Sequence, residues 1–278
     1  VQHPGASRDP GGRPLVAAAV GVVGDFRERA QALVEAGCDA LVVDVAHGHS
    51  DHTIEAVRAL KRDHPGVDLV AGNVATAEGT IDLIEAGADA VKVGVGPGAA
   101  CTTRIVTGFG VPQLTAVLEC SEAARRYDVP IIADGGVKAA GDVVKALAAG
   151  ADTAMVGSLL AGTEESPGTT VRRDGKLFKV YRGMASRGAT IDRRRREREL
   201  TEDDELLEDG GVVPEGVEAL VPHVGPVAGV LQQLVGGIRS GMSYCGAHTV
   251  AELRERARFV RVTEAGLRES SPHDLVAE

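Results

Sequence analysis

Tryptophan is absent from this 278-residue sequence, and aromatic residues make up only 3% of it. Hydrophobic residues still reach 44%, so the core has to be built from Val, Ala, Leu and Ile. Such a core is typical of parallel sheets whose faces are covered by helices. The length suits one large domain or two small ones.

Positive charge is also in short supply. Lys and Arg number 30 against 40 Asp and Glu, which gives a formal net charge of −10. We therefore expect no binding to nucleic acid or to an anionic membrane surface. No signal peptide and no apolar run of spanning length is visible, so no membrane association is expected. A phosphate ligand would have to be held by local backbone dipoles.

Cysteine pairs with metal or disulfide spacing are missing. The four cysteines lie far apart, at Cys38, Cys101, Cys120 and Cys245, with no CxxC motif. This usage favours a reducing compartment, so the prediction is a cytoplasmic protein. Cys38 and Cys120 fall in helical stretches and Cys245 in a Tyr-Cys-Gly turn. These three fit the ordinary buried thiol best.

What the sequence does contain is a repeated alternation of short apolar runs and helical stretches. The runs span 15–22, 40–48, 69–74, 90–96, 131–136 and 153–158. Three of the intervening helical stretches close on a glycine, at Gly37, Gly87 and Gly150, which indicates helix C-caps leading into strands. Strands alternating with helices of this length predict βαβ units and a parallel sheet.

Functional-looking residues follow nearly every predicted strand, which favours a (β/α)8 TIM barrel. A doubly wound open sheet is the alternative, but it would gather such residues at one switch point. Only six βα units are present, so the expected α/β fold is an incomplete barrel whose first two units lie upstream of Val1. The predicted organisation is a leader or linker over 1–14 and the catalytic barrel portion over 15–278.

The alternation of apolar runs and helical stretches ends after Ser158. Residues 172–183 alternate like a hairpin around Asp174-Gly175. A basic and then acidic block over 193–211 is either a solvated loop or a mobile lid, and we place a lid region at 186–214. Residues 227–242 predict a final amphipathic helix. The polar tail, 264–278, is expected to be mobile unless something pins it.

The stretch "KVGVGPGAACTTR", residues 92–104, places a cysteine at the end of a glycine-rich loop. Gly94, Gly96 and Gly98 let the backbone approach a ligand or turn its carbonyls toward a cation. Cys101 in such a loop is a candidate nucleophile, and Thr103 offers a hydroxyl that can share a proton. The alternative is a small buried hydrophobe, which is what most cysteines are.

Two further loops indicate a phosphate site. "IIADGGV", 131–137, and "AMVGSLLAG", 154–162, follow consecutive strands and carry glycines with Ser158. Asp134 cannot bind phosphate, because like charges repel, and is placed to accept bonds from ribose hydroxyls. The alternative is a structural Asp in a turn. The stretch "VVDVAHGHS", 42–50, contains His47 and His49, but no further metal-coordinating residue is clustered with them. Contact between this strand end and a second bound molecule is therefore favoured over a metal site. Asn73, at the end of the next strand, points to the same site.

Taken together, these motifs resemble the family of IMP dehydrogenase and GMP reductase. The matching stretches are "GVGPGAACTTR", "IIADGGVKAAGDVVKALAAGA", "MVGSLLAGTEESPG", "YRGMAS", "PEGVE", "GGIRSGMSYCGA" and "ARFVRVTEAGLRESSPHD". The resemblance runs from about Leu15 to Asp274. In that family a regulatory pair of CBS motifs follows the second barrel unit, which accounts for a chain that starts at the third.

The resemblance implies roles for particular residues. Cys101 would attack C2 of a purine nucleotide, assisted by Thr103. The nucleotide would be bound by Asp134, Gly136, Gly157, Ser158, Tyr181, Gly183, Met184 and Glu215. An NAD cofactor would face Asp44, Asn73, Lys92, Gly94 and Gly96. A monovalent cation, K+, would be bound by Gly96, Gly98 and Cys101, and by Glu269, Ser270 and Ser271 of a neighbouring subunit in a homotetramer.

Two departures from the family pattern bear on the reaction. Ala99 stands where the family usually has a serine that contacts the nucleotide. The lid has Arg193 to Arg196 but lacks the tyrosine of the dehydrogenase's Arg-Tyr pair, so the general base is unassigned. We predict IMP dehydrogenase, which oxidises IMP to XMP with NAD, ahead of GMP reductase, which uses NADPH to convert GMP to IMP and ammonia. A nucleotide-binding homologue without turnover is the third alternative.

Overall fold

A computed structural model describes residues 6–196 and 213–272 of the chain. Six parallel strands form one sheet: β1 (Ala17–Val20), β2 (Ala40–Asp44), β3 (Asp68–Val74), β4 (Ala90–Val93), β5 (Ile131–Asp134) and β6 (Thr153–Met155). Their order in the sheet is their order in the sequence. A doubly wound sheet reverses its order at the switch point, and this sheet never does. The predicted α/β fold, six strands of a (β/α)8 barrel, is confirmed.

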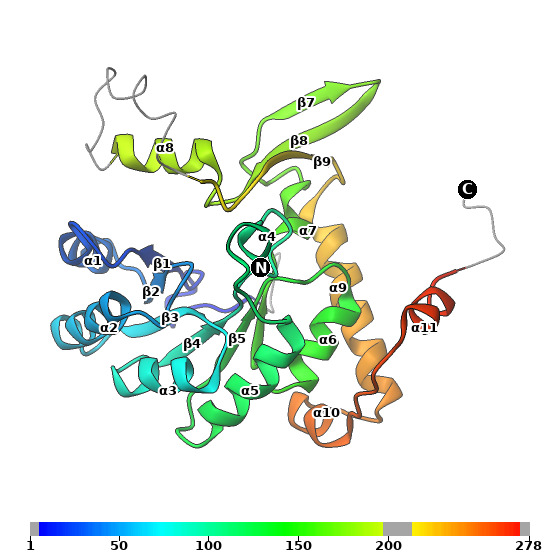
Figure 1. Cartoon of the computed structure of the whole chain (residues 1–278), viewed down its shortest axis with the longest axis horizontal. Coiled ribbons are helices and arrows are strands. Elements are labelled where there is room, and N and C mark those ends of the chain that lie inside the picture. Colours follow the sequence, from blue (N-terminus) through cyan, green and yellow to red (C-terminus); the bar gives the residue numbers. More distant parts are fainter. Residues whose placement is uncertain (1–5, 197–212, 273–278) are drawn as a thin grey trace.

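Helices between successive strands cover the outside of this curled sheet (Figure 1). They are α1 (Phe26–Glu35), α2 (Asp51–Asp63), α3 (Ala77–Glu85), α5 (Gln113–Arg125) and α6 (Ala140–Ala148). Ser50 and Thr76 cap α2 and α3, because each side-chain oxygen accepts the backbone N–H of the third residue of its helix, Thr53 or Gly79. The predicted glycine C-caps all have positive φ, at 86° for Gly37, 111° for Gly87 and 118° for Gly150.

The core lies between the sheet and these helices; among the described residues its fully buried side chains are aliphatic or small, and Phe26 of α1 packs against it only partly buried. Buried positions alternate along the strands, as at Leu41, Val43, Leu69 and Ala71. In β4, Val91 and Val93 are buried, and so is Lys92 between them. The composition predicted this kind of core, because parallel strands covered by helices are built from branched aliphatic residues.

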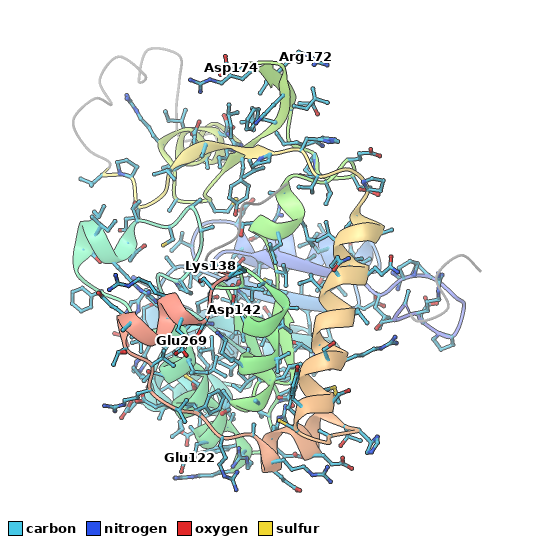
Figure 2. The ribbon with its side chains drawn as sticks, turned by 90° about the vertical axis from the view of Figure 1, so that its right-hand side faces the viewer. Glu122, Lys138, Asp142, Arg172, Asp174 and Glu269 are labelled. Atoms are coloured by element: carbon cyan, nitrogen blue, oxygen red, sulfur yellow. The ribbon has the colours of Figure 1, made fainter. Side chains whose placement is uncertain are left out.

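A second, antiparallel sheet follows the barrel strands. It consists of β7 (Thr170–Arg173), β8 (Lys176–Arg182) and β9 (Glu218–Pro222). The predicted hairpin turn is confirmed, because Asp174 and Gly175 both have positive φ, 48° and 76°. Figure 2 shows Arg172 and Asp174 at the far tip of this hairpin. Sequence analysis missed β9, which pairs with β8 across the lid region.

The predicted lid region, 186–214, is described only in part. Helix α8 (Arg187–Arg196) starts it, and residues 197–212 lie outside the described residues. The N-terminus of α8 is tied to β9, since Glu218 Oε1 accepts the N–H of Gly188 at 3.0 Å and the hydroxyl of Ser186 at 3.1 Å. Arg182 and Asp192 form an ion pair at 2.7 Å. The base of the lid is therefore fixed to the second sheet.

The predicted amphipathic helix is confirmed as α9 (Val227–Tyr244), but the prediction that it is the last helix is wrong. Helices α10 (Val250–Arg256) and α11 (Glu264–Glu269) follow it. Helix α9 packs on α6 through small residues. A Cβ atom on Gly237 would lie 2.3 Å from Ala140 Cβ, so this crossing needs a glycine.

The described part of the predicted leader is joined to the barrel. Asp39, at the start of β2, accepts the backbone N–H of Val16 at 2.7 Å and the guanidinium of Arg13 at 2.6 Å. Residues 1–5 of the leader and 273–278 of the tail lie outside the described residues. Within 6–196 and 213–272, no helix combines the length and apolar character needed to cross a membrane.

Candidate active site

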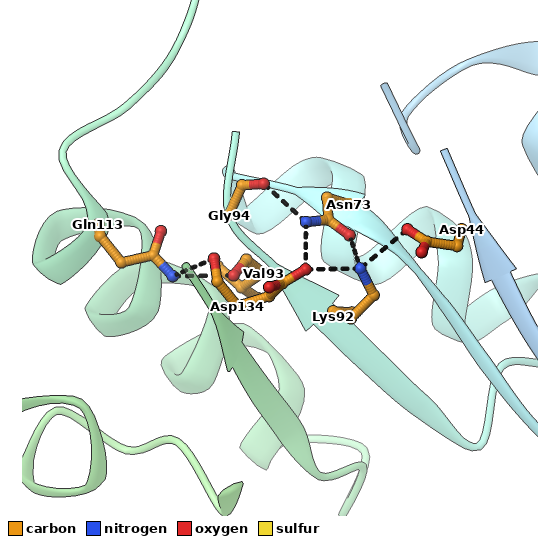
Figure 3. Close-up of polar contacts among 7 residues, drawn as sticks. All are labelled: Asp44, Asn73, Lys92, Val93, Gly94, Gln113 and Asp134. Atoms are coloured by element: carbon orange, nitrogen blue, oxygen red, sulfur yellow. Dashed lines mark hydrogen bonds and ion pairs between the residues drawn. The ribbon is translucent and has the colours of Figure 1, made fainter. Parts of the chain in front are cut away.

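Polar side chains from four successive strands meet at the carboxyl end of the sheet (Figure 3). Asp44 ends β2, Asn73 lies near the end of β3, Lys92 lies in β4 and Asp134 ends β5. Lys92 Nζ donates to Asp44 Oδ1 at 3.0 Å, to Asp134 Oδ2 at 2.7 Å, and to Asn73 Oδ1. These contacts bring together four residues that sequence analysis had placed in cofactor and ribose sites.

Lys92 differs from its partners in burial. It is 1% exposed, whereas the side chain of Asp44 is 51% exposed and that of Asp134 is 24% exposed. A buried ammonium is tolerated only when paired and hydrogen-bonded, and here two carboxylates and an amide oxygen surround it. Of the two residues predicted to face the cofactor, Asp44 is therefore exposed at the strand ends and Lys92 is buried behind it.

Two glycines leave the space that this cluster needs. A Cβ on Gly72 would lie 2.5 Å from the Lys92 carbonyl oxygen and 2.8 Å from Lys92 Cβ. A Cβ on Gly94 would lie 2.1 Å from the Asp134 carbonyl oxygen, and Gly94 also has a φ of 151°. Both positions require glycine on packing grounds. Gly94 therefore shapes the strand end and accepts a 2.8 Å bond from Asn73 Nδ2 at its carbonyl.

Gln113, at the start of α5, is a site residue that sequence analysis missed. Its Nε2 donates to the carbonyls of Val93 at 2.9 Å and Asp134 at 3.1 Å, so it joins the ends of β4 and β5 (Figure 3). Its Oε1 is buried with no partner among the described residues. Only the amide type and its position just after the cysteine loop could have signalled this role.

Cys101 lies beside a possible proton path. Its thiol donates to Thr103 Oγ1 at 3.2 Å, and the Thr103 hydroxyl donates to Glu215 Oε2 at 2.8 Å. These two hydrogen bonds run from the Cys101 sulfur through the Thr103 hydroxyl to the Glu215 carboxylate, which is the final acceptor. A carboxylate in this position can take up the thiol proton and return it to a reacting group. We call Cys101, Thr103 and Glu215 the cysteine relay.

The backbone on both sides holds the relay in place. Thr102 N donates to the Glu215 carbonyl at 2.8 Å, and Val217 N donates to the Ala100 carbonyl at 2.9 Å. A Cβ on Gly183 would lie 3.1 Å from that same Ala100 oxygen, so the predicted base-site turn lies against the cysteine loop. Met184, one residue on, is 85% exposed. Segment 213–217 therefore completes the loop from a distant part of the chain.

Of the two predicted phosphate loops, the first lies against the cysteine loop and the second lies against Tyr181. A Cβ on Gly135 would lie 2.9 Å from Pro97 Cγ, and Gly136 has a φ of 77°. Ser158 starts the short helix α7 (Ser158–Ala161), and a Cβ on Gly157 would lie 3.8 Å from the Tyr181 hydroxyl. The Tyr181 hydroxyl of β8 and Gly157 thus lie side by side.

The first loop leads into α6 through a capping carboxylate. Asp142 Oδ2 accepts the N–H groups of Lys138 at 3.0 Å and Ala139 at 3.1 Å, and Lys145 pairs with it at 2.9 Å. Partial burial acts to raise the pKa of Asp142, but these bonds and Lys145 outweigh it and hold the pKa below its usual value. Figure 2 shows Lys138 and Asp142 together at this helix end.

Some predicted residues do not join the site within this chain. Glu269 ends α11, and Ser270 and Ser271 follow it; Figure 1 places α11 apart from the cysteine loop and the short helix α4 (Thr103–Thr107). His49 Nε2 lies 2.7 Å from Asp82 Oδ2, and His47 is exposed. The described residues contain no cluster of three His, Cys, Asp or Glu side chains that could hold a metal ion.

The donor chemistry fits a monovalent cation and a dinucleotide. Gly96 has a φ of 85°, and from the described part of the chain the carbonyl of Gly98 accepts a single bond, the Cys101 N–H at 3.0 Å, so a lone pair remains for a cation. On the cofactor side, Asp44 has one carboxylate oxygen on Lys92 and another with no bond among the described residues. A free carboxylate oxygen suits a ribose hydroxyl.

Two of the other three thiols, Cys120 and Cys38, are poor nucleophiles. Cys120 is buried, and desolvation raises its pKa to about 11. Burial and the neighbouring Asp39 also raise the pKa of Cys38. A thiol with a raised pKa is largely protonated near neutral pH, and the thiolate is the reactive form. The prediction that these two cysteines are structural agrees with this geometry.

The fold and the cysteine relay define an enzyme-like (β/α)8 barrel with its polar residues at the carboxyl ends of the strands. The family model for the IMP dehydrogenase / GMP reductase domain matches residues 1–273. This chain belongs to that family, as its motifs predicted.

Relatives of both names are similar to the chain. It is 55% identical over 274 residues to inosine-5'-monophosphate dehydrogenase of Nitrosopumilus maritimus, covering 99% of this chain and 57% of that protein. It is 57% identical over 272 residues to GMP reductase of Leishmania donovani, covering 97% of this chain and 54% of that protein. The chain thus spans about half the length of these relatives.

A solved structure is similar throughout the chain. It is a crystal structure of a GMP reductase variant from Trypanosoma brucei in complex with guanosine 5'-monophosphate. The TM-score is 0.92 at 53% sequence identity, and the match covers 99% of this chain and 55% of that one. Identity alone does not separate the two activities, because relatives of both names lie within a few per cent of each other.

Proposed function

We propose that this chain is the catalytic part of an oxidoreductase that acts on a purine nucleotide through a covalent bond between Cys101 and C2 of the base. The observation that carries the proposal is the cysteine relay, with 3.2 Å from Cys101 Sγ to Thr103 Oγ1 and 2.8 Å from there to Glu215 Oε2. A nucleophile with an adjacent proton acceptor is the arrangement that covalent catalysis requires.

The neighbouring loops supply a nucleotide site of the right chemistry. Asp134 presents its second carboxylate oxygen, Oδ1, to the ribose hydroxyls, while Oδ2 is bonded to Lys92. Gly136, Gly157, Ser158 and Tyr181 bind the phosphate through backbone and hydroxyl donors. Gly183 and Met184 border the base. The GMP bound by the similar reductase supports a purine nucleotide as the ligand.

A nicotinamide cofactor binds on the other side of the cysteine loop, next to Asp44, Asn73, Gly94 and Gly96. When bound, it exchanges a hydride with C2 of the base. The carbonyls of Gly96, Gly98 and Cys101 bind K+. Glu269, Ser270 and Ser271 reach this cation site only from a neighbouring subunit of a homotetramer. We assign the protein to the cytoplasm on its cysteine usage.

Of the two reactions of the family, the relay favours the reductase. The Cys101 proton passes through Thr103 to Glu215 as sulfur bonds to C2 of GMP, and returns to the 2-amino group, which leaves as ammonia. NADPH supplies the hydride to C2, the C–S bond breaks, and IMP is released. In balance, GMP, NADPH and one proton give IMP, NADP+ and ammonia. The relay thus places a proton donor where the departing amine needs it.

The dehydrogenase, which the sequence motifs placed first, remains the second candidate. The turn "YRGM" and the tail "RSGMSYCGA…AGLRESSPHD" favour it. Its last step needs a base that deprotonates water, and in the family a lid Arg-Tyr pair fills this role. No tyrosine lies between Tyr181 and Tyr244, so Glu215 would have to act as that base here. The relay, added to this absence, is why the reductase is proposed first.

One pair of assays on the full-length protein separates these candidates. GMP with NADPH, and IMP with NAD+, are incubated with the protein while the absorbance of reduced nicotinamide is followed. We expect NADPH consumption with GMP and release of ammonia. NADH formation with IMP alone would establish the dehydrogenase instead. No change in absorbance in either assay, with nucleotide binding retained, would support a nucleotide-binding homologue without turnover.

A further inference from the structure

We infer that Lys92 is a positioning residue that orients two carboxylates at once, Asp134 for the nucleotide ribose and Asp44 for the cofactor ribose. The inference rests on the proposed function and refines it, because sequence analysis had assigned Lys92 to cofactor contact. Lys92 is 1% exposed and lies behind the two carboxylates, so it acts through them.

The geometry of the two carboxylates is the first support. Lys92 Nζ binds Oδ2 of Asp134 at 2.7 Å and Oδ1 of Asp44 at 3.0 Å. The remaining oxygen of each carboxylate has no hydrogen bond among residues 6–196 and 213–272. Each carboxylate is thus held through one oxygen and offers the other as an acceptor. Such an acceptor suits the hydroxyl of a cis-diol, and a reaction between two nucleotides brings two riboses to one site.

The charge balance is the second support. The cluster holds one ammonium and two carboxylates, with Asn73 as a neutral member that bonds both Lys92 and Asp134. Without the Lys92 ammonium, the carboxylates of Asp44 and Asp134 would lie in one partly buried site with no positive charge between them. A buried charge that has lost its partner is strongly unfavourable. Asn73 alone cannot replace it, because its Nδ2 is shared between Asp134 at 3.0 Å and the Gly94 carbonyl at 2.8 Å.

The strand order explains why one lysine can serve both sites. Lys92 lies in β4, between β3 on one side and β5 on the other, and Asp44 ends β2 beyond β3. Gly72 in β3 has no side chain, which lets the Lys92 chain lie across that strand toward Asp44. The cofactor side and the nucleotide side are therefore joined by one side chain across four neighbouring strands, β2 to β5.

The test uses equilibrium binding of the nucleotide alone, so that it does not depend on turnover. The affinity of GMP and of IMP is measured by calorimetry for the full-length wild type, Lys92→Met, Asp44→Asn and the double variant. Losing a charge-assisted bond to Asp134 should weaken nucleotide binding about tenfold in Lys92→Met. The same substitution in the Asp44→Asn background should cost only about threefold, because one of the two repelling anions is gone.

This partial recovery distinguishes orientation from a general packing role. A lysine that only fills space would give the same fold-change in both backgrounds, and that result would overturn the inference. Equal nucleotide affinity in wild type and Lys92→Met would overturn it as well and leave the proposed function standing. If Lys92→Met does not fold, the comparison of the double variant with Asp44→Asn still decides, since equal affinity there refutes the role. A wild type that binds neither nucleotide would overturn both proposals.

Discussion

Glu215 accepts the hydroxyl of Thr103 at 2.8 Å although 112 residues separate the two in the sequence. The bond links the barrel to the segment that follows the lid, and it joins a carboxylate to the hydroxyl beside Cys101. Residues on both sides are tied by backbone bonds, so the pairing does not rest on side chains alone. The proposed chemistry depends on this junction.

The first prediction concerns the carboxylate of the relay. Glu215→Gln keeps the shape and the bond to Thr103 but cannot take up a proton. We expect the rate of ammonia release to fall by about 10² to 10⁴ while GMP affinity changes little, since positioned acids and bases contribute that much. Stopped-flow measurement of ammonia release, with calorimetry for affinity, checks this. Glu218→Gln, on β9 and bonded to the lid helix, is the matched control. Equal loss in both variants would remove Glu215 from the mechanism.

The second prediction concerns thiol reactivity. Burial raises the pKa of Cys120 to about 11, so the thiolate fraction of Cys120 near neutral pH is very small. Iodoacetamide should leave Cys120 unmodified in the folded protein and modify it only after denaturation. Bound nucleotide should slow modification of Cys101 without changing that of Cys38. Peptide mass spectrometry after timed labelling measures each site, and labelling of native Cys120 at the rate of Cys101 would be inconsistent with the structure.

A matched pair of glycines tests the packing of α9 on α6. Gly237→Ala would put a Cβ 2.3 Å from Ala140 Cβ, and overpacking of this kind costs about 1–3 kcal/mol. Gly236→Ala, one residue earlier, meets nothing within 4 Å and should stabilise the helix by about 0.5–1 kcal/mol. Urea unfolding of both variants gives the two values. If the two changes had the same sign, the close crossing would be wrong.

The dependence of the melting temperature on pH in the acid range tests the contacts that join the leader to β2. The Val16 N–H and then the Arg13 guanidinium hold the pKa of Asp39 below its usual value of 3.8. A lowered folded-state pKa contributes stability above the unfolded pKa, and this contribution is lost as pH falls through the folded pKa. Asp39→Asn should therefore lower the melting temperature at pH 7 and make it less sensitive to pH below about 4. Asp174→Asn, at the exposed hairpin tip, should leave the whole profile unchanged. If the melting temperature of Asp39→Asn fell with pH as steeply as that of the wild type, Asp39 would not be the source of this acid sensitivity.

Much of the barrel could be predicted from the sequence, because its strands and helices are local patterns. Each βα unit carries its own signals, such as the glycine at the end of α1, α3 or α6 that takes a positive φ. The hairpin at Asp174-Gly175 is likewise encoded in two adjacent residues. The order of strands followed from where the polar residues fell, since a barrel has functional residues at nearly every strand.

The contacts that organise the site were harder to predict from the sequence. The family resemblance predicted that Glu215 borders the purine base, but its bond to Thr103 was not predicted, because a contact across 112 residues has no local signature. The resemblance implied that Lys92 faces the cofactor, but its burial behind Asp44 was not predicted, since the contacts that bury it come from neighbouring strands. Strand β9 and Gln113 were missed for related reasons, as both act through non-local backbone bonds.

The central claim is that Cys101 forms a covalent bond with the purine nucleotide. Its most direct test is acid quenching of the full-length protein during turnover with GMP and NADPH, followed by trypsin digestion and mass spectrometry of the peptide Val93–Arg104, which contains Cys101 and no other cysteine. The account predicts a nucleotide adduct on this peptide without the 2-amino group, and none in Cys101→Ala. Turnover with no adduct in the wild type, together with turnover retained in Cys101→Ala, would contradict it.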